Sequence, residues 1–506
     1  MTSCSSQLDI SAALDRWRAA IGAENVTCDS ETLRAAETAT FATSQRVPAI
    51  LRPADRAEVQ ECLRIAAAHG VPVYPVSRGR NWGLGSRVPA RGECVLLELS
   101  RMDRIRGFDE ELAHVTVEPG VTFRQLYEFL VRRRSRLYLN TIGGSPEASV
   151  LANALERGDG SGPYADRFAH VCALEVVLST GECLHTGFGR FGGPLAPLHR
   201  WGVGPALDGL FSQSNLGVVT ELTVWLTPLP RSLHAVRFSL RGSERLARTV
   251  DVLRGLRLEG TVRAPVGLWN HRRVHSVSQQ SSVSASDEGR WFGLTALYAA
   301  SPELGAALRR ELERGLGPEV DDLSIEARSG EPRSGLELFS DDDPALLFLQ
   351  GIPHEGSLRS MYWKKGALVP PRPAPEADRC GVIWLCPAVP FGGQHVVSAV
   401  ELAEQVLSAR GFEPLLALVG ASERCVYLLP AIVYDRDVPG CDARAMACHD
   451  ELLDRFCRLG YLPHRLGIQS MDSLPDARDD SAAALRRIKA ALDPAGVLAP
   501  GRYDGA

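Results

Sequence analysis

The sequence predicts an α+β protein with two domains. Its 506 residues exceed what one compact core normally holds, since single cores stop growing at roughly 250–300 residues. Strand and helix patterns interleave up to Pro230, and a new strand–helix pattern begins directly after it. We therefore expect one domain over residues 1–230, a second domain of mixed helices and strands (α/β) over 231–463, and a closing segment over 464–506.

The elements of the first domain follow from periodicity and end signals. Residues 55–70, DRAEVQECLRIAAAHG, carry apolar residues at helical spacing and end on a glycine, and VPVYPV (71–76) then predicts a short buried strand. A glycine-rich loop, SRGRNWGLG (77–85), comes next. Further along, the patterns predict two strands, a helix with a threonine cap, a hairpin and an alternating strand: CVLLELSRM, HVTVEPG, TFRQLYEFLVRR, LEVVLSTGECLHTG and GVVTELTVWLTPLP.

The second domain and the closing segment contain fewer sequence signals of secondary structure. RSLHAVRFSLRGSERLARTVDVLRGLR (231–257) predicts a strand followed by a helix, and SVSQQSSVSASDEGR (276–290) predicts a polar surface loop. The last stretch, from residue 480, predicts a helix that ends at Asp493-Pro494 and an extended tail.

Composition excludes several classes of function. No apolar run reaches the roughly 18 residues of a membrane span, and a net charge of −5 argues against nucleic acid as a partner. Only three of the 56 basic residues are lysines, which disfavours Schiff-base chemistry. The twelve cysteines form no CxxC or zinc pattern, so we expect reduced thiols and no metal. The N-terminus lacks a secretory signal, and we expect a cytoplasmic enzyme.

The loop over residues 77–85 suggests phosphate binding without an ordinary dinucleotide fingerprint. Its glycines are spaced GxxxGxG and the stretch that follows is not helical, whereas a Rossmann loop needs GxGxxG at the start of a helix. A Walker loop would need Gly-Lys-Ser/Thr. Backbone amides and Arg/Asn donors could still surround a pyrophosphate. On composition alone, an ordinary turn after a strand stays open as the alternative.

Several stretches together are similar to one family. The loop SRGRNWGLG resembles the S-x-G-R-N-x-G-x-G loop of the vanillyl-alcohol oxidase family of flavoproteins. Six further stretches agree in order and spacing and extend to Tyr503: ASVLANALERGDGSGPYADRF, LEVVLSTGECLHTG, WGVGPALDGLFSQSNLGVVT, GIPHEGSLRSMYW, PHRLGIQSMD and LDPAGVLAPGRY. The likeness is strongest to the branch that oxidises para-substituted phenols.

The resemblance implies an FAD-binding domain, a substrate (cap) domain over 231–463 and a return of 464–506 to the FAD domain. It also implies a flavin cofactor, which one branch of the family tethers covalently through a tyrosine. Tyr427 matches that position. The alternative is that Tyr427 is an aromatic core residue of a strand. The implied FAD-binding residues are Ser77, Arg78, Gly79, Arg80, Asn81, Gly83, Leu84, Gly85, Gly143, Gly144, Asn153, Arg157, Gly158, Val218, Val219, Tyr427 and Arg502.

Three residues are implied to be catalytic. Arg465 matches the arginine of the family's phenolate site, where a permanent cation would favour the ionised phenol. Asp166 matches the aspartate near flavin N5 and would act as general base; a turn-capping aspartate is the alternative. His464 stands beside Arg465 where the family usually has a tyrosine.

Departures from the family predict a shifted substrate. Leu84 replaces a second tyrosine of the phenolate site and cannot donate a hydrogen bond, so another tyrosine such as Tyr362 is a candidate replacement. The cluster NHRRVH (270–275) could receive a carboxylate, although such a cluster is more often a solvated face.

We expect a phenolic substrate derived from tyrosine, benzylic hydride removal, and either loss of CO2 to a styryl product or hydration to an alcohol. A sugar or alcohol oxidase and a non-catalytic flavin protein remain the alternatives. Oxygen is the expected electron acceptor, and a homodimer is left open.

Overall fold

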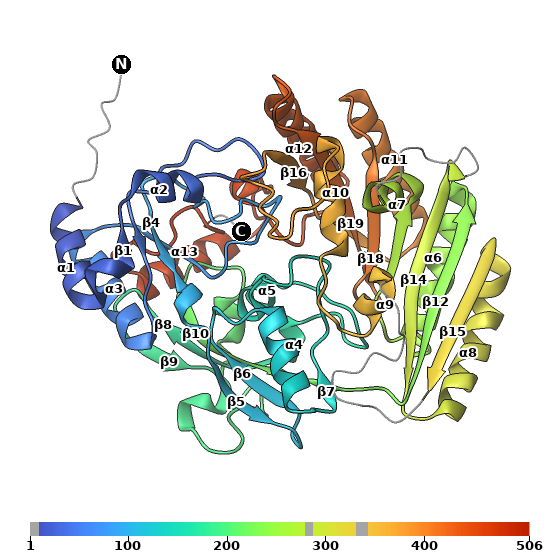
Figure 1. The fold of residues 1–506 in the computed structure, drawn as a ribbon, viewed down its shortest axis with the longest axis horizontal. Helices are drawn as coiled ribbons and strands as arrows, with labels where there is room; N and C mark the ends of the chain where they lie inside the picture. The colour runs from blue at the N-terminus through green and yellow to red at the C-terminus, as the bar shows by residue number, and fades with distance from the viewer. Residues whose placement is uncertain (1–9, 279–286, 330–342, 505–506) are drawn as a thin grey trace.

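The computed structural model describes residues 10–278, 287–329 and 343–504. Two groups of sheets stand side by side (Figure 1), the first drawn in blue to green and the second in yellow to orange. The first group is a four-stranded and a five-stranded sheet, and the second is a single eight-stranded sheet. Mixed helices and sheets in two bodies are what the sequence predicts.

The four-stranded sheet carries the glycine-rich loop. Its strands, in spatial order, are β1 (Val26–Thr27), β2 (Ile50–Leu51), β4 (Val95–Glu98) and β3 (Val73–Val76). Helices α1 (Ser11–Ile21) and α3 (Arg56–His69) pack on it through a core that includes Trp17 and Leu63. The Asp55 side chain caps α3 by accepting from Glu58 N, and Gly70 closes it at φ 64°, so the predicted helix–strand unit is confirmed.

The five-stranded sheet is antiparallel and lies beside the first. Its order is β5 (Ile105–Asp109), β6 (His114–Val117), β10 (Val218–Trp225), β8 (Val171–Val177) and β9 (Cys183–His185). The predicted hairpin is the β8–β9 pair, whose turn contains Gly181 at φ 82°. Helix α4 (Phe123–Arg132) starts at Thr122, which accepts from Gln125 N as the cap pattern predicts.

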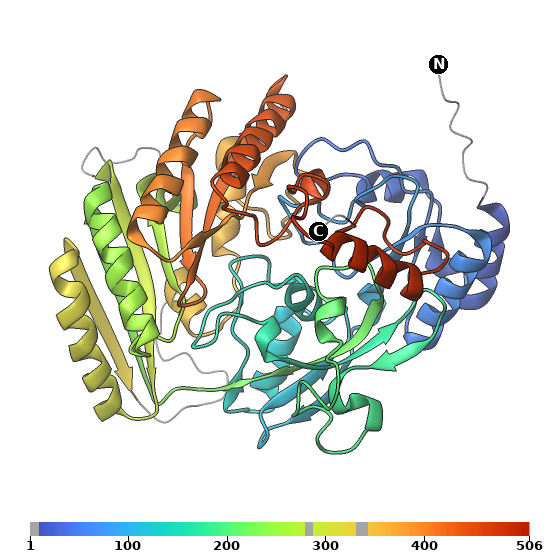
Figure 2. The same ribbon diagram turned by 180° about the vertical axis from the view of Figure 1, so that it is seen from behind.

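The eight-stranded sheet pairs its strands antiparallel, although helices and strands alternate along the chain. Its strands are β15 (Asp322–Ser329), β12 (Ser232–Arg241), β14 (Arg290–Ala299), β13 (Val266–Asn270), β18 (Leu415–Gly420), β19 (Cys425–Asp435) and β16 (Cys380–Trp384), with β17 (Ala388–Pro390) also on β19. Four helices cover the outer face, as Figure 2 shows: α6 (Ser243–Leu258), α8 (Pro302–Leu316), α11 (Gly393–Ala409) and α12 (Cys441–Arg458).

Alternation along β18 and β19 separates two faces of this sheet. Leu416, Leu418 and Leu428 point into the core under the outer helices. Ala417 and Leu429 face the opposite way, into a large cavity. The inner face of the sheet therefore forms one wall of that cavity, and short helices such as α7 (His271–Ser278) lie along it.

The end of the chain rejoins the first part. Helix α13 (Ser481–Leu492) ends before Asp493-Pro494, as predicted, and its Ile488 and Leu492 pack on the core of the five-stranded sheet. Val73 N donates to Val497 O at 2.8 Å, and Ala499 N donates to Val73 O at 2.8 Å. The tail thus adds to the sheet edge at β3. The domain limits at residues 230 and 463 stay predictions.

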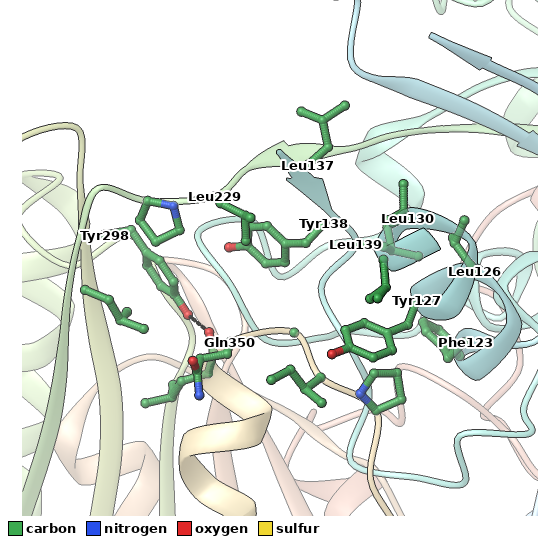
Figure 3. Close-up of a pocket in the computed structure, with 17 residues that line it drawn as sticks. Phe123, Leu126, Tyr127, Leu130, Leu137, Tyr138, Leu139, Leu229, Tyr298 and Gln350 are labelled. Atoms are coloured by element: carbon green, nitrogen blue, oxygen red, sulfur yellow. Dashed lines mark hydrogen bonds between the residues drawn. The ribbon is translucent and has the colours of Figure 1, made fainter. Parts of the chain in front are cut away.

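An apolar seam joins the two bodies (Figure 3). Tyr138 from β7 (Leu137–Tyr138) and side chains of α4 lie opposite Tyr298 of β14, whose hydroxyl donates to Leu349 O at 2.6 Å. The space between them is only about 40 Å³, which is too small for a cofactor.

Two further expectations concern a polar surface loop and membrane-spanning helices. The central part of the polar loop expected over 276–290 lies outside the described residues, which omit 279–286. None of the helices in the described ranges combines the length and apolar character needed to cross a bilayer. The remaining helices are α2 (Ser30–Ala36), α5 (Val150–Leu155), α9 (Pro344–Leu349) and α10 (Arg359–Tyr362), and β11 (Thr227–Pro228) pairs with β7.

Candidate active site

A cavity of about 1070 Å³ lies between the first two sheets and the inner face of the eight-stranded sheet. Ordinary pockets for drug-sized ligands run from roughly 300 to 1,000 Å³, so this space can hold a ligand as large as a dinucleotide together with a substrate. Its walls come from the glycine-rich loop, residues 143–145, α5, β10, the inner face of β14, β18 and β19, and residues 464–468.

The glycine-rich loop presents its first half to the cavity and packs its second half behind it. Residues 77–81 and Leu84 line the cavity, whereas Gly83 and Gly85 do not. A Cβ on Gly83, which has φ 78°, would collide with the ring of Trp384. A Cβ on Gly85 would lie 2.7 Å from Ile468, at φ 122°. These two glycines shape the loop and do not line the cavity, and their expected contact with the cofactor stays a prediction.

Most of the other predicted cofactor residues reach the same cavity. Those that line it are Gly143, Gly144, Asn153, Gly158, Val218, Val219, Tyr427 and Arg502. Arg157 does not: it is exposed, has φ 51°, and its Nε donates to Ser212 Oγ at 2.8 Å. The expected contact of Arg157 with the cofactor stays a prediction.

Arg465 brings an unpaired donor to the cavity. Its Nε is buried and has no hydrogen-bond partner within the described residues. A buried unpaired donor is costly, so a ligand with a negative oxygen would complete this group. Arg465 comes from the segment after α12 that also lines the cavity with His464, Leu466 and Ile468.

His464 is held in one orientation by two contacts. Its Nδ1 donates to Cys386 O at 3.0 Å, and its ring stacks on Tyr427 with centroids 3.7 Å apart. Burial first, and then the charge of Arg465, lowers the pKa of His464 to about 3. The ring is therefore neutral near pH 7, with Nε2 left as an acceptor. His464 cannot replace the donor that a tyrosine would supply, but it can accept a hydrogen bond from a phenol.

The predicted carboxylate, Asp166, lies outside the cavity wall. It is exposed, and its Oδ1 accepts from Ala169 N at 3.0 Å, which is the capping role given above as the alternative. The next residue, Arg167, is buried. The charge of Asp166 still contributes to the raised pKa of two cavity-lining residues, Asp159 and Tyr427, so the catalytic role of Asp166 stays a prediction.

A second carboxylate, Asp159, lines the cavity instead. Burial raises its pKa, and the charge of Arg465 opposes that rise. The two side chains form no ion pair in the described structure, and both line the cavity. Sequence reasoning passed over Asp159 because the family motif around GDGSGPYADRF drew attention to Asp166. The signal was present as a second acidic residue seven positions earlier.

Tyr362 does not replace the missing tyrosines. It is buried away from the cavity, and its hydroxyl donates to Asp378 Oδ2 at 2.5 Å. Leu84, in contrast, lines the cavity and is 3% exposed, so the wall at this position is apolar.

The comparisons with known proteins agree with this arrangement. A family model described as an FAD binding domain matches residues 47–187, and a model of the C-terminal domain of FAD linked oxidases matches residues 427–503. The 1'-carboxy-chondrochloren decarboxylase of Chondromyces crocatus is 45% identical over 97% of both chains. This chain belongs to the FAD-linked oxidase family. The family resemblance found in the motifs is thereby confirmed, and FAD is the cofactor.

Other relatives place this FAD-linked oxidase in the branch expected from its motifs. The flavoprotein subunit of 4-cresol dehydrogenase from Pseudomonas putida is 28% identical over 98% of this chain and 96% of that one. The structure of p-cresol methylhydroxylase matches with a TM-score of 0.87 and 25% identity, covering 97% and 96% of the two chains. That of 4-ethylphenol oxidase from Gulosibacter chungangensis gives a TM-score of 0.86 at 24% identity over 98% and 97%, which supports the fold.

The residues of the cavity fit FAD. The loop over residues 77–81 offers backbone and side-chain donors at the wall. A Cβ on Gly143 would meet no atom within 4 Å, so a large planar group can approach the backbone there. When bound, FAD supplies a hydride acceptor. Arg502 also lines the wall, and its guanidinium pairs with Glu156 and donates to Tyr74 Oη at 3.0 Å.

A glycine-to-alanine pair tests how the loop is built. We expect Gly83→Ala to lower the free energy of unfolding by about 3 kcal/mol, because the new Cβ meets the Trp384 ring and the backbone has positive φ. Gly143→Ala, whose Cβ would meet open space, should leave the unfolding temperature of the cofactor-free protein unchanged. Thermal unfolding of both variants without FAD measures the difference, and equal unfolding temperatures would contradict it.

Proposed function

We propose that this FAD-linked oxidase removes a hydride from the benzylic carbon of a para-substituted phenol and that loss of CO2 from the adjacent carbon gives a styryl product. The observation that carries the proposal is Arg465, a cavity-lining cation whose buried Nε has no partner among the described residues. The decarboxylase of Chondromyces crocatus, at 45% identity, supports the decarboxylating outcome.

The proposed reaction first requires a site that binds the substrate as a phenolate. Ionising the phenol makes hydride loss easier, because the product is then a neutral quinone methide. For a tyrosine-derived acid, the carboxylate next leaves as CO2. Its bonding pair forms the new carbon–carbon double bond, and the ring regains its electrons as phenolate. Arg465 stabilises the phenolate at both the beginning and the end of this sequence.

Asp159 and His464 complete the phenol end of the site. Asp159, with its raised pKa, is the carboxylate placed to take the phenolic proton. Neutral His464 offers Nε2 as an acceptor and holds the Tyr427 ring by stacking. Leu84 leaves the remaining wall apolar, so phenol binding depends on fewer donors than in the family pattern.

We further propose a covalent link between FAD and Tyr427. Tyr427 lines the cavity, and in the motif resemblance it matches the position of the family's tether. Burial, then the charge of Asp159, raises the pKa of Tyr427 to about 12. Because the phenolate is the nucleophile, the rate of attachment should rise with pH, by up to about tenfold per unit below that pKa.

The measurement is incorporation of FAD into cofactor-free protein at several pH values, followed by acid precipitation. We expect yellow precipitate in the native protein and release of all FAD from Tyr427→Phe. Complete release of FAD from the native protein would overturn the link.

Substrate class is tested by anaerobic bleaching of the flavin. We expect reduction by 4-alkylphenols and N-acyl tyrosines and none by sugars or aliphatic alcohols. Reduction by sugars alone would instead support an alcohol oxidase, and no reduction by any phenol would support a protein that merely binds flavin.

The electron acceptor, assembly and location are proposals of the same kind. We propose oxygen as the acceptor, a homodimer and a cytoplasmic location. Oxygen uptake during turnover tests the first, and the mass in solution tests the second. Turnover that requires an added electron carrier would reject oxygen.

A further inference from the structure

Arg273 is a buried cation in the cavity wall that no described carboxylate neutralises. It lies on α7, lines the cavity and is 8% exposed. Its Nη1 donates to Ser360 Oγ at 2.6 Å, and its guanidinium carbon lies 5.0 Å from the centre of the Trp384 ring. It forms no ion pair with any described residue. Burial lowers its pKa to about 10, and no neighbouring charge in the described ranges offsets that effect.

The local fold fixes this side chain. Asn270, at the end of β13, accepts from Arg273 N at 3.0 Å and donates to Pro414 O at 2.8 Å, so the start of α7 is pinned to the sheet. Val274 and Val277 line the cavity beside Arg273. Arg272 does not line it. Burial raises the pKa of Glu404, and the charge of Arg272 opposes that rise, so Arg272 acts on a carboxylate elsewhere. Of the two arginines in the cluster, only Arg273 lines the cavity.

An unpaired buried guanidinium costs stability unless an anion completes it. Two places in one cavity carry such a cation, Arg465 and Arg273. His464, next to Arg465, stacks on Tyr427, whereas Trp384, which contacts Arg273, pairs with Ala431 further along β19. They are therefore separate positions. Leu429, which lies between Tyr427 and Ala431 on β19 and lines the cavity, makes the wall between the two positions apolar.

We propose that Arg273 binds the carboxylate of the substrate, while Arg465 binds the phenolate. This inference rests on the proposed function and names the substrate class: a para-hydroxyphenyl acid with an anion at each end. Guanidinium and carboxylate match in planar geometry and charge. Hydride loss forms the quinone methide, and the bond between the carboxyl carbon and its neighbouring carbon must face it for CO2 to leave. The contact with Arg273 holds this bond in that orientation. Trp384 and Ser360 hold the guanidinium in place.

The test compares two phenols that differ in the carboxylate alone, N-acetyltyrosine and N-acetyltyramine. In Arg273→Gln we expect the second-order rate constant of flavin reduction to fall about 30-fold for N-acetyltyrosine and to stay within about twofold for N-acetyltyramine. Arg273→Lys should recover part of the preference for the acid. Arg272→Gln, on the same helix, is the matched control and should behave as the native protein.

Each other result decides against the proposal. An equal loss with both phenols would make Arg273 a structural residue. Loss of FAD from folded Arg273→Gln would make it a cofactor contact. If Arg273→Gln does not fold, Arg273→Lys decides, because it must still prefer N-acetyltyrosine over its methyl ester. If neither phenol reduces the native protein, the proposed function fails, and that result is distinct from a failure of Arg273 alone.

Discussion

Replacing Arg465 with methionine is expected to slow flavin reduction by 4-alkylphenols about 10³-fold. The substitution keeps much of the side-chain volume and removes the permanent cation at the phenol end of the cavity, where Arg465 Nε has no partner among the described residues. Loss of one preorganised charge-stabilising group costs roughly 10²–10³ in rate, and the role proposed for Arg465 is to stabilise a full phenolate. Stopped-flow absorbance without oxygen measures the rate.

The pH dependence of the same variant gives a second readout. In the proposed site, the charge of Arg465 lowers the pKa of the bound phenol, so we expect the native protein to hold the phenolate near neutral pH. Without the cation, the phenol regains its ordinary pKa of about 10. Reduction by Arg465→Met should therefore rise as pH increases from 7 to 10. Arg465→Lys, which keeps the charge, should lie between the two proteins, and a methionine variant with native rates would contradict the phenolate site.

Replacing Asp159 with asparagine is expected to lower turnover about 10²-fold while FAD stays bound. General-base catalysis contributes roughly 10²–10⁴-fold, and Asp159 is the carboxylate in the cavity wall near Arg465. The base must be ionised, and burial raises its pKa. Activity of the native protein should therefore fall as pH drops through a pKa above the ordinary value of about 3.9, and this acid limb should vanish in Asp159→Asn.

Asp166→Asn is the matched control. Asp166 is exposed and caps Ala169 N, so we expect turnover within about twofold of the native value and a small loss of stability from the weakened cap. Steady-state turnover of both variants with the same phenol makes the comparison. The reverse pattern, a large loss for Asp166→Asn and none for Asp159→Asn, would return the catalytic role to the residue that the family motif predicts.

Local signals predicted the scaffold well. The α3–β3 unit carried a cap at Asp55 and a closing glycine at Gly70, and both act as expected. Thr122 starts α4, and Gly181 turns the β8–β9 hairpin. These features depend on residues within a few positions of one another, so sequence contains the information. The order in which the strands of the eight-stranded sheet pair depends on distant contacts and could not be obtained in the same way.

The motifs predicted which residues form the site better than they predicted where the side chains lie. Motifs identified Arg465, His464 and Tyr427, and the structure brings all three to the cavity. Side-chain direction was the weak point. Asp166 and Arg157 are exposed and do not line the cavity, and a motif does not reveal this. Arg273 looked like part of a solvated face, and only tertiary packing shows that it is buried.

The decisive measurement is a single turnover of N-acetyltyrosine with the FAD-loaded protein, with the product analysed by mass and the released CO2 quantified. We expect bleached flavin, one CO2 per flavin reduced, and a styryl amide lighter than the substrate by CO2 and two hydrogens. An alcohol that retains the carboxyl group, formed without CO2, would contradict decarboxylation, and unchanged flavin would contradict oxidation of the phenol altogether.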